Sequence, residues 1–102
     1  MLILKPNCEL CDIDLAPDSK DARICSYECT FCVGCVESVL ENVCPNCGGG
    51  FSARPIRPAN AYRAGVSLLD HPASGERVIT KLSRDEIKSF SSRLKTIKPE
   101  CR

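Results

Sequence analysis

Eight of the nine cysteines in this 102-residue chain lie within forty residues, and their spacing is that of metal ligands. Four Cys-x-x-Cys units lie there, and two of them share Cys32. Two sulfurs separated by two residues can reach one Zn²⁺ from a tight turn, because Zn–S bonds are about 2.3 Å long. Eight thiolates suffice for two tetrahedral sites. The predicted ligands are Cys8, Cys11, Cys25, Cys29, Cys32, Cys35, Cys44 and Cys47.

Disulfides and iron–sulfur clusters are the two alternatives to zinc. Eight cysteines admit about 105 disulfide connectivities. However, residues 1–6 are too short for a signal peptide and lack a cleavage pattern. We therefore expect a cytoplasmic protein whose thiols stay reduced. Four thiolates also suit iron, but the division into two evenly supplied tetrahedral sets favours two Zn²⁺ per chain.

So small a core is expected to need these ions in order to fold. Between Cys8 and Cys47 there are few apolar residues other than cysteine, and there is no Trp. Units this short usually need a metal or disulfides. Structural zinc contributes about 10–16 kcal/mol in finger peptides, so we expect metal binding and folding to be nearly one event.

The formal net charge of +1 conceals an asymmetry between the two halves of the chain. Residues 1–50 carry three basic and eight acidic side chains, whereas residues 51–102 carry eleven basic and five acidic ones. The first half is too acidic to follow a phosphate backbone, so any affinity for nucleic acid would come from the basic residues 54–98. No apolar run approaches the roughly 20 residues needed to cross a bilayer.

Residues 1–57 are predicted to form a small metal-stabilised α+β unit. The short apolar stretches 22–25 and 30–32 favour a hairpin with Phe31 in the core, and residues 51–54 favour a closing strand. The unit therefore combines two or three short strands with tight Cys-x-x-Cys turns that bind metal. We call these turns knuckles, the first at residues 8–11 and the last at residues 44–47.

A helix of about two turns is predicted from Val36 to Val43, where apolar residues recur at i, i+3, i+4 and i+7. Asn42 and Val43 are expected to end it before the last knuckle. The later stretch 54–58 predicts a polyproline-like linker, because each of its prolines favours extended backbone in the residue before it. We therefore place the boundary of the unit near residue 57.

Residues 58–102 are predicted to form a basic extension that ends in a helix at 84–97. Ser83 to Glu86 form a capping box, and apolar residues then recur at i, i+3, i+7 and i+10 before Pro99. In the simplest interpretation this helix docks on the first unit. In the alternative it meets an acidic partner or nucleic acid.

The remainder of the extension carries weaker signals. Residues 59–69 have helical spacing but contain Gly65, which leaves that segment ambiguous. Residues 77–80 favour a short strand. His71 stands beside a proline and is expected to be a turn residue rather than a ligand, and Cys101 is expected to be a free thiol in a frayed tail.

The spacing alone leaves three ways of sharing eight cysteines between two ions. Sequential pairing would join the first four and then the last four, and a nested arrangement would join the outer four around the inner four. In a cross-brace, one ion is held by Cys8, Cys11, Cys32 and Cys35, and the other by Cys25, Cys29, Cys44 and Cys47.

The order and gaps of the cysteines resemble those of the RING finger, with Cys29 where that family usually has His. Residues 29–35 are similar to its middle segment and residues 44–47 to its final knuckle. The resemblance implies a RING-like, treble-clef-type zinc finger with cross-brace pairing, and it makes the cross-brace our preferred prediction. It also implies a partner surface made by Leu10, Val39 or Leu40, and Pro45.

The first half of the chain also resembles a family of short bacterial cysteine-rich proteins that is classed only as a domain of unknown function. This likeness extends from Leu4 through Cys25 to Gly48 and is closer than the likeness to the RING finger. It implies membership of a family without implying an activity.

These observations predict a zinc-binding interaction module that contacts an unidentified protein partner and is not an enzyme. Four thiolates fill the shell of a zinc ion and leave no position for a catalytic water. No Ser–His–Asp or paired-carboxylate arrangement stands out. The two alternatives are a nucleic-acid-binding protein that uses residues 54–98 and a RING-type ubiquitin-ligase-like adaptor.

Overall fold

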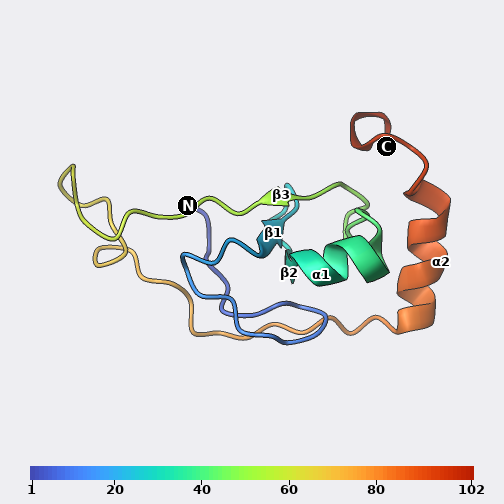
Figure 1. The fold of residues 1–102 in the computed structure, drawn as a ribbon, viewed down its shortest axis with the longest axis horizontal. Coiled ribbons are helices and arrows are strands. Elements are labelled where there is room, and N and C mark those ends of the chain that lie inside the picture. The colour runs from blue at the N-terminus through green and yellow to red at the C-terminus, as the bar shows by residue number, and fades with distance from the viewer.

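The computed structural model describes residues 1–102 and shows an elongated molecule of 45 × 27 × 18 Å. A small sheet and a short helix lie at its centre, and the last helix stands at one end (Figure 1). No helix combines the length and apolar character needed to span a membrane. The elements in chain order are β1 (Ala22–Ile24), β2 (Thr30–Cys32), α1 (Val33–Cys35), the π-helical turn η1 (Val36–Leu40), β3 (Ser52–Ala53), α2 (Arg84–Leu94) and the 3₁₀ turn η2 (Pro99–Cys101).

The three strands form one antiparallel sheet in the order β2-β1-β3. Ala22 lies opposite Cys32 and Ile24 opposite Thr30, which confirms the predicted hairpin. Phe31 is fully buried, as predicted, and its ring meets that of Phe51 edge to face at 5.5 Å. The predicted closing strand is also present, shortened to the two residues of β3.

The central helix starts and ends earlier than predicted. It runs from Val33 through η1 to Leu40, because Cys32 acts as the N-cap and its Sγ accepts the backbone N–H of Cys35 at 3.4 Å. It ends where Glu41 and Asn42 adopt positive φ angles of 50° and 60°. Left-handed backbone at two successive residues cannot continue a right-handed helix. The predicted span of Val36 to Val43 was therefore displaced by three residues.

Cysteines make up much of the core. The main cluster of eleven buried residues contains five of them, alongside Phe31, Leu40 and Ile87. These five are Cys8, Cys25, Cys29, Cys35 and Cys44. The apolar interior and the sulfur-rich centre are thus the same part of the molecule.

Helix α2 packs against the turn η1, as the simpler interpretation of the sequence predicts. Ser83 caps it by accepting the N–H of Glu86 at 3.1 Å, and Ile87 is 1% exposed within the main core cluster. The helix ends at Leu94, three residues before the predicted end at 97. The helix also packs closely against the loop at Gly48, since a Cβ added to that glycine would lie 3.1 Å from a methyl carbon of Leu94.

Residues 58–82 run back along the first unit without forming a helix or strand (Figure 1). The helical spacing in residues 59–69 does not produce a helix, and Leu69 is 88% exposed because nothing packs against an apolar face there. The predicted strand at 77–80 was also wrong. Its segment is nevertheless held, because Thr80 donates its N–H to the carbonyl of Glu9 at 2.7 Å.

The C-terminal tail is ordered rather than frayed, in contrast to the prediction. Pro99 begins the turn η2, and the guanidinium of Arg102 donates to the carbonyls of Asn42 at 2.8 Å and Gly48 at 3.1 Å. The tail is thereby tied to the loop that carries the last cysteines. Cys101 is exposed on this turn.

Replacing Ile87 with Ala should lower the free energy of unfolding of the zinc-loaded chain by about 2–4 kcal/mol, because the change opens a cavity between α2 and the core. Ile97→Ala is the matched control, since Ile97 is 37% exposed, and it should cost well under half as much. Urea denaturation followed by circular dichroism measures both variants. Equal losses would mean that α2 does not contribute to the core as described.

Candidate metal centre

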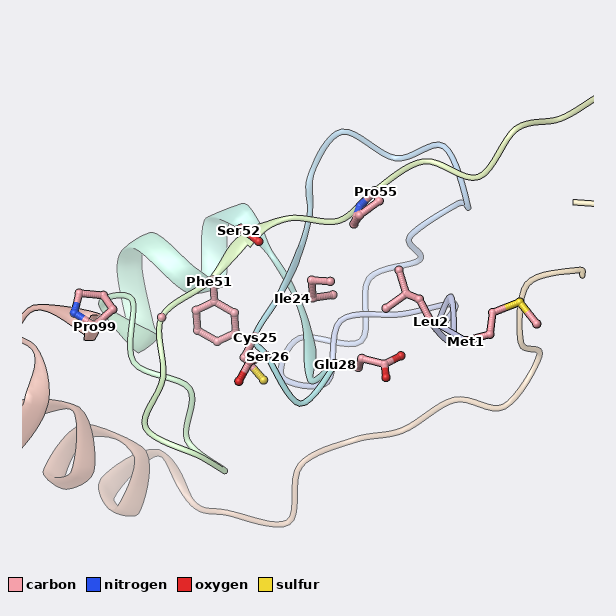
Figure 2. Close-up of a pocket in the computed structure, with 11 residues that line it drawn as sticks. Met1, Leu2, Ile24, Cys25, Ser26, Glu28, Phe51, Ser52, Pro55 and Pro99 are labelled. Atoms are coloured by element: carbon pink, nitrogen blue, oxygen red, sulfur yellow. The ribbon is translucent and has the colours of Figure 1, made fainter. Parts of the chain in front are cut away.

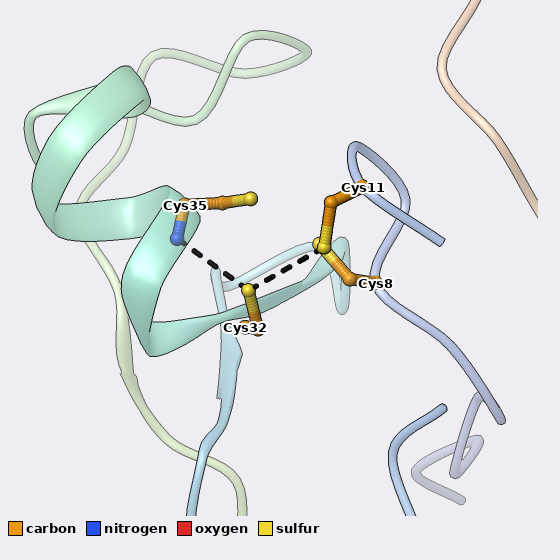
Figure 3. A group of neighbouring side chains, drawn as sticks. All are labelled: Cys8, Cys11, Cys32 and Cys35. Atoms are coloured by element: carbon orange, nitrogen blue, oxygen red, sulfur yellow. Dashed lines mark hydrogen bonds between the residues drawn. The ribbon is translucent and has the colours of Figure 1, made fainter. Parts of the chain in front are cut away.

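The first group of cysteines joins the first knuckle to the start of α1. The four Sγ atoms of Cys8, Cys11, Cys32 and Cys35 all lie within 4.8 Å of one another (Figure 3). The sulfurs of Cys11 and Cys32 are 3.7 Å apart. Tetrahedral zinc with bonds of about 2.3 Å requires a sulfur separation of about 3.8 Å, whereas a disulfide has a bond of about 2.05 Å. The spacing fits ligands that share one ion.

Local structure brings these four residues together. The backbone of the first knuckle folds on itself, because Cys8 donates its N–H to Ile13 O and Asp12 donates to Cys8 O. Asp12 has a φ of 66°, which closes the turn tightly. Cys32 is the last residue of strand β2, and Cys35 lies one helical turn later in α1, so that both sulfurs face the first knuckle.

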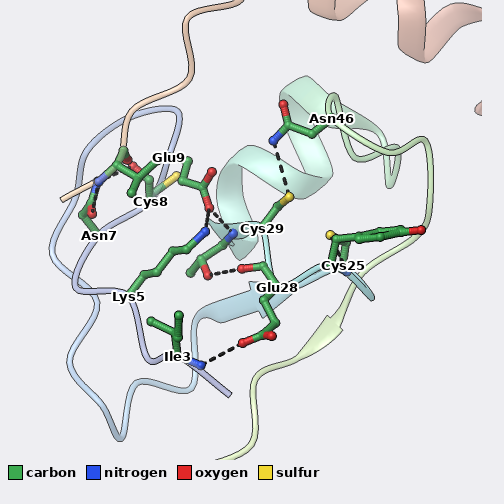
Figure 4. Close-up of polar contacts among 12 residues, drawn as sticks. Ile3, Lys5, Asn7, Cys8, Glu9, Cys25, Glu28, Cys29 and Asn46 are labelled. Carbon is green, nitrogen blue, oxygen red and sulfur yellow. Dashed lines mark hydrogen bonds and ion pairs between the residues drawn. The ribbon is translucent and has the colours of Figure 1, made fainter. Parts of the chain in front are cut away.

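The second group joins the end of β1 to the last knuckle. The Sγ atoms of Cys25, Cys44 and Cys47 lie within 4.8 Å of one another. Cys29 is buried nearby but is not within that distance of all three. Its sulfur accepts a hydrogen bond from the side-chain amide of Asn46 at 3.4 Å (Figure 4).

The grouping bears directly on the three possible pairings. Cys8 and Cys11 meet Cys32 and Cys35, while Cys25 meets the last knuckle. A cross-brace groups these seven cysteines in this way, and the sequential and nested arrangements do not. Cys29 is the one predicted ligand that belongs to neither group. It lies beside the second group without being fully part of it.

Several N–H groups point at the sulfurs, as is usual around metal-bound thiolates. Tyr27 donates to Cys25 Sγ at 3.3 Å and Gly49 donates to Cys47 Sγ at 3.4 Å, in addition to the bonds from Cys35 and Asn46. Gly48 follows the last knuckle with a φ of 80°, a conformation that glycine adopts without strain. These donors favour the thiolate form and orient the sulfur lone pairs.

Without an ion, burial disfavours the thiolate form of four of these cysteines. Burial raises the pKa of Cys29, Cys32, Cys35 and Cys44, because charged sulfur loses its hydration. At Cys8 burial also acts to raise the pKa, but the backbone N–H groups around it outweigh burial and lower it. A bound cation would remove the cost of holding several thiolates together, so the donor set fits a divalent metal.

Three buried polar side chains that support the first knuckle were not predicted from the sequence. Asn7 is fully buried and its amide contacts Cys8 O, Asp12 Oδ1 and Val78 O. Glu9, also buried, accepts the backbone N–H of Thr30 and pairs with the ammonium group of Lys5 (Figure 4). The local pattern does not reveal that these residues are buried, because Val78 and Thr30, which help to hold them, are distant in the sequence.

Arg54 is the third of these side chains. Its guanidinium donates to Lys5 O at 2.8 Å and Ala16 O at 3.0 Å, and burial lowers its pKa. Arg57 likewise donates to Leu2 O and His71 O, each at 2.6 Å. Through these hydrogen bonds, the segment that follows β3 is attached to the N-terminal arm.

The basic half of the chain also pairs with the acidic half. Arg77 contacts Asp12 at 2.8 Å and Asp14 at 2.6 Å, and Lys95 contacts Glu41 at 3.3 Å. Part of the positive charge that could meet a phosphate backbone is therefore already engaged within the molecule.

The partner surface predicted from the RING resemblance is only partly exposed. Leu10 and Val39 are half-buried, but Leu40 has no exposed area and Pro45 is buried. Of the two alternatives on the helix, Val39 is therefore the accessible one, because Leu40 lies in the core cluster together with Ile87 of α2, and Pro45 offers no exposed surface. His71 and Cys101 lie outside both cysteine groups, and His71 is half-buried in the loop 67–71, where it donates its N–H to Ser67 O.

Comparison with known proteins finds a family match over the cysteine-rich half of the chain. The family model described as "Protein of unknown function (DUF1272)" matches residues 1–57. A relative, the "Uncharacterized protein R02474" of Rhizobium meliloti (strain 1021), is 56% identical over 79 residues, which cover 78% of this chain and 87% of that protein. No solved structure matches the chain.

Replacing Asn46 with Ala should speed the release of one zinc ion to a chromogenic chelator by about tenfold, because Cys29 loses its hydrogen-bond donor. The second ion should leave at the rate measured for the unmodified chain. Asn60→Ala is the control, since Asn60 is exposed in the extension. An unchanged release rate for both ions would show that the amide does not support this sulfur.

Proposed function

This chain belongs to the family of proteins of unknown function (DUF1272), and we propose that it is a zinc-binding structural module that mediates contacts between proteins. The observation that carries the proposal is the gathering of sulfurs from distant segments into two groups of ligand geometry. Two Zn²⁺ per chain would hold the unit together.

Zinc fits this donor set better than other metals. Thiolate sulfur at tetrahedral spacing selects zinc or iron–sulfur clusters, and zinc needs no inorganic sulfide. The first ion would be held by Cys8, Cys11, Cys32 and Cys35. The second would be held by Cys25, Cys44 and Cys47, with Cys29 as the fourth ligand after a small movement of its sulfur that keeps the hydrogen bond from Asn46.

The finer architecture we propose is a RING-like, treble-clef-type finger with a cross-brace. The β-hairpin β1–β2, the helix that follows it and the knuckles at both ends support this proposal. The nine cysteines are all unpaired, which supports a reducing compartment such as the cytoplasm.

No catalysis is proposed for this module. Filled sulfur shells leave no coordination position for water or substrate, and zinc bound in this way supplies structure alone. The one histidine lies outside both cysteine groups. The residues of the module would therefore act by presenting a rigid surface.

The proposed partner is a protein rather than nucleic acid. Residues 1–50 carry a net charge of −5, which repels phosphate, and Arg54, Arg57, Arg77 and Lys95 make contacts within the chain. A ubiquitin-ligase-like adaptor is less well supported, because Leu40 and Pro45 of the expected surface are buried. Leu10 and Val39 remain accessible in part.

A protein captured by the zinc-loaded chain should be lost when zinc is removed, because the surface depends on the metal-held fold. Affinity capture followed by mass spectrometry of the bound proteins measures this. Leu10→Ala, with zinc content unchanged, tests whether the first knuckle takes part, and Tyr62→Ala in the exposed loop is the control. If the same proteins are captured in equal amounts with and without zinc, the proposal of a zinc-dependent interaction module is contradicted.

A further inference from the structure

A groove of about 690 Å³ lies beside the second cysteine group and shares only Cys25 with it. The N-terminal arm closes one end and Pro99 of η2 the other (Figure 2). Its volume is within the range of ligand-binding sites. The floor and walls are mostly apolar and are made by Leu2, Ile24, Phe51 and Pro55 together with Pro99.

One acidic side chain stands in this groove. Glu28 is the only Asp, Glu, Lys or Arg in the lining, and it takes part in none of the four salt bridges of the molecule. Its Oε1 accepts the N–H of Ile3 at 2.7 Å (Figure 4). Because a carboxylate can accept about four hydrogen bonds, Glu28 retains acceptor capacity that faces an apolar surface.

The backbone holds Glu28 in an unusual conformation. Its φ is 66°, a value uncommon in residues other than glycine. Its N–H donates to Cys25 O and its carbonyl accepts the hydroxyl of Thr30, both at 3.0 Å. The position of the carboxylate is therefore fixed by the same loop that carries Cys25, and metal binding would make it more rigid.

Strand β3 borders the groove through Ser52, and its outer edge is open. Strand β3 is the last in the sheet order, and Ser52 and Ala53 are both exposed. Arg54 donates its N–H to Ala22 O, so the N–H of Ala53 faces away from β1, because successive groups of an antiparallel strand alternate in direction. Such an edge can accept a further extended chain.

We propose that this groove binds an extended peptide of a partner protein that carries an Arg or Lys flanked by apolar residues. The basic group pairs with Glu28, its aliphatic stem lies along Ile24 and Phe51, and the peptide backbone pairs with Ala53. The carboxylate of Glu28, which is in none of the salt bridges, attracts such a peptide and disfavours an acidic one. This inference rests on the proposed function as an interaction module and gives it a surface and a partner chemistry.

The test is NMR titration of the ¹⁵N-labelled, zinc-loaded full chain. The probe is the peptide acetyl-Ile-Thr-Arg-Thr-Ile-amide, in which Arg and both Ile side chains share one face of a strand. Amide shifts should change at Glu28, Phe51 and Ala53. Substituting Glu for the central Arg of the peptide should abolish these shifts.

Glu28→Gln is the matched variant, because the amide oxygen still accepts from Ile3 while the charge is removed. It should weaken binding about tenfold, as expected for loss of one charge-assisted hydrogen bond. Glu37→Gln, which removes an exposed carboxylate outside the groove lining, should bind like the unmodified chain.

Two results would overturn the groove proposal with the module intact: a folded, zinc-loaded chain that shows no shifts at millimolar peptide, or a Glu28→Gln variant that binds equally well. Zinc content and spectral dispersion are read from the same samples. A chain that is folded without zinc would instead contradict the proposed function and, with it, the basis of this inference.

Discussion

The convergence of sulfur atoms from distant parts of the chain is the constraint on which the rest of this structure depends. The first knuckle meets residues more than twenty positions later, and the end of β1 meets the last knuckle. Five of these cysteines also belong to the main core cluster. Because the chain has few large apolar side chains in this region, two ions held by sulfur would take the place of an extended apolar interior.

The C-terminal extension then closes this unit rather than forming a separate body. Ile87 completes the core under α2, Arg102 binds backbone carbonyls of the first unit, Arg57 of the first unit binds the carbonyl of His71, and Arg77 meets the acidic loop of that unit. The charge asymmetry of the sequence is thus partly an internal complementarity. Exposed ion pairs contribute little stability singly, so the apolar contact of Ile87 and the backbone hydrogen bonds are the main attachments.

Short-range patterns predicted the local structure well. The hairpin, the buried Phe31 and the Ser83 cap of α2 all follow from a few neighbouring residues, and all are present. Long-range packing could not be predicted in the same way. Leu40 and Pro45 were expected to face a partner, yet they are buried, and Leu40 packs in the same cluster as a helix more than forty residues away in the chain. Asn7 and Glu9 were missed for the same reason, since their hydrogen-bond partners include Val78 and Thr30.

The dependence of the fold on metal is tested most directly by native mass spectrometry and ¹H–¹⁵N NMR on one freshly purified sample, before and after a strong chelator is added. The account predicts two zinc ions per chain at the start. After chelation it predicts collapse of amide dispersion throughout residues 1–57 and in α2, restored when zinc is returned. A chain that keeps its dispersed spectrum without metal, or whose mass shows the loss of hydrogen that accompanies disulfide formation, would contradict it.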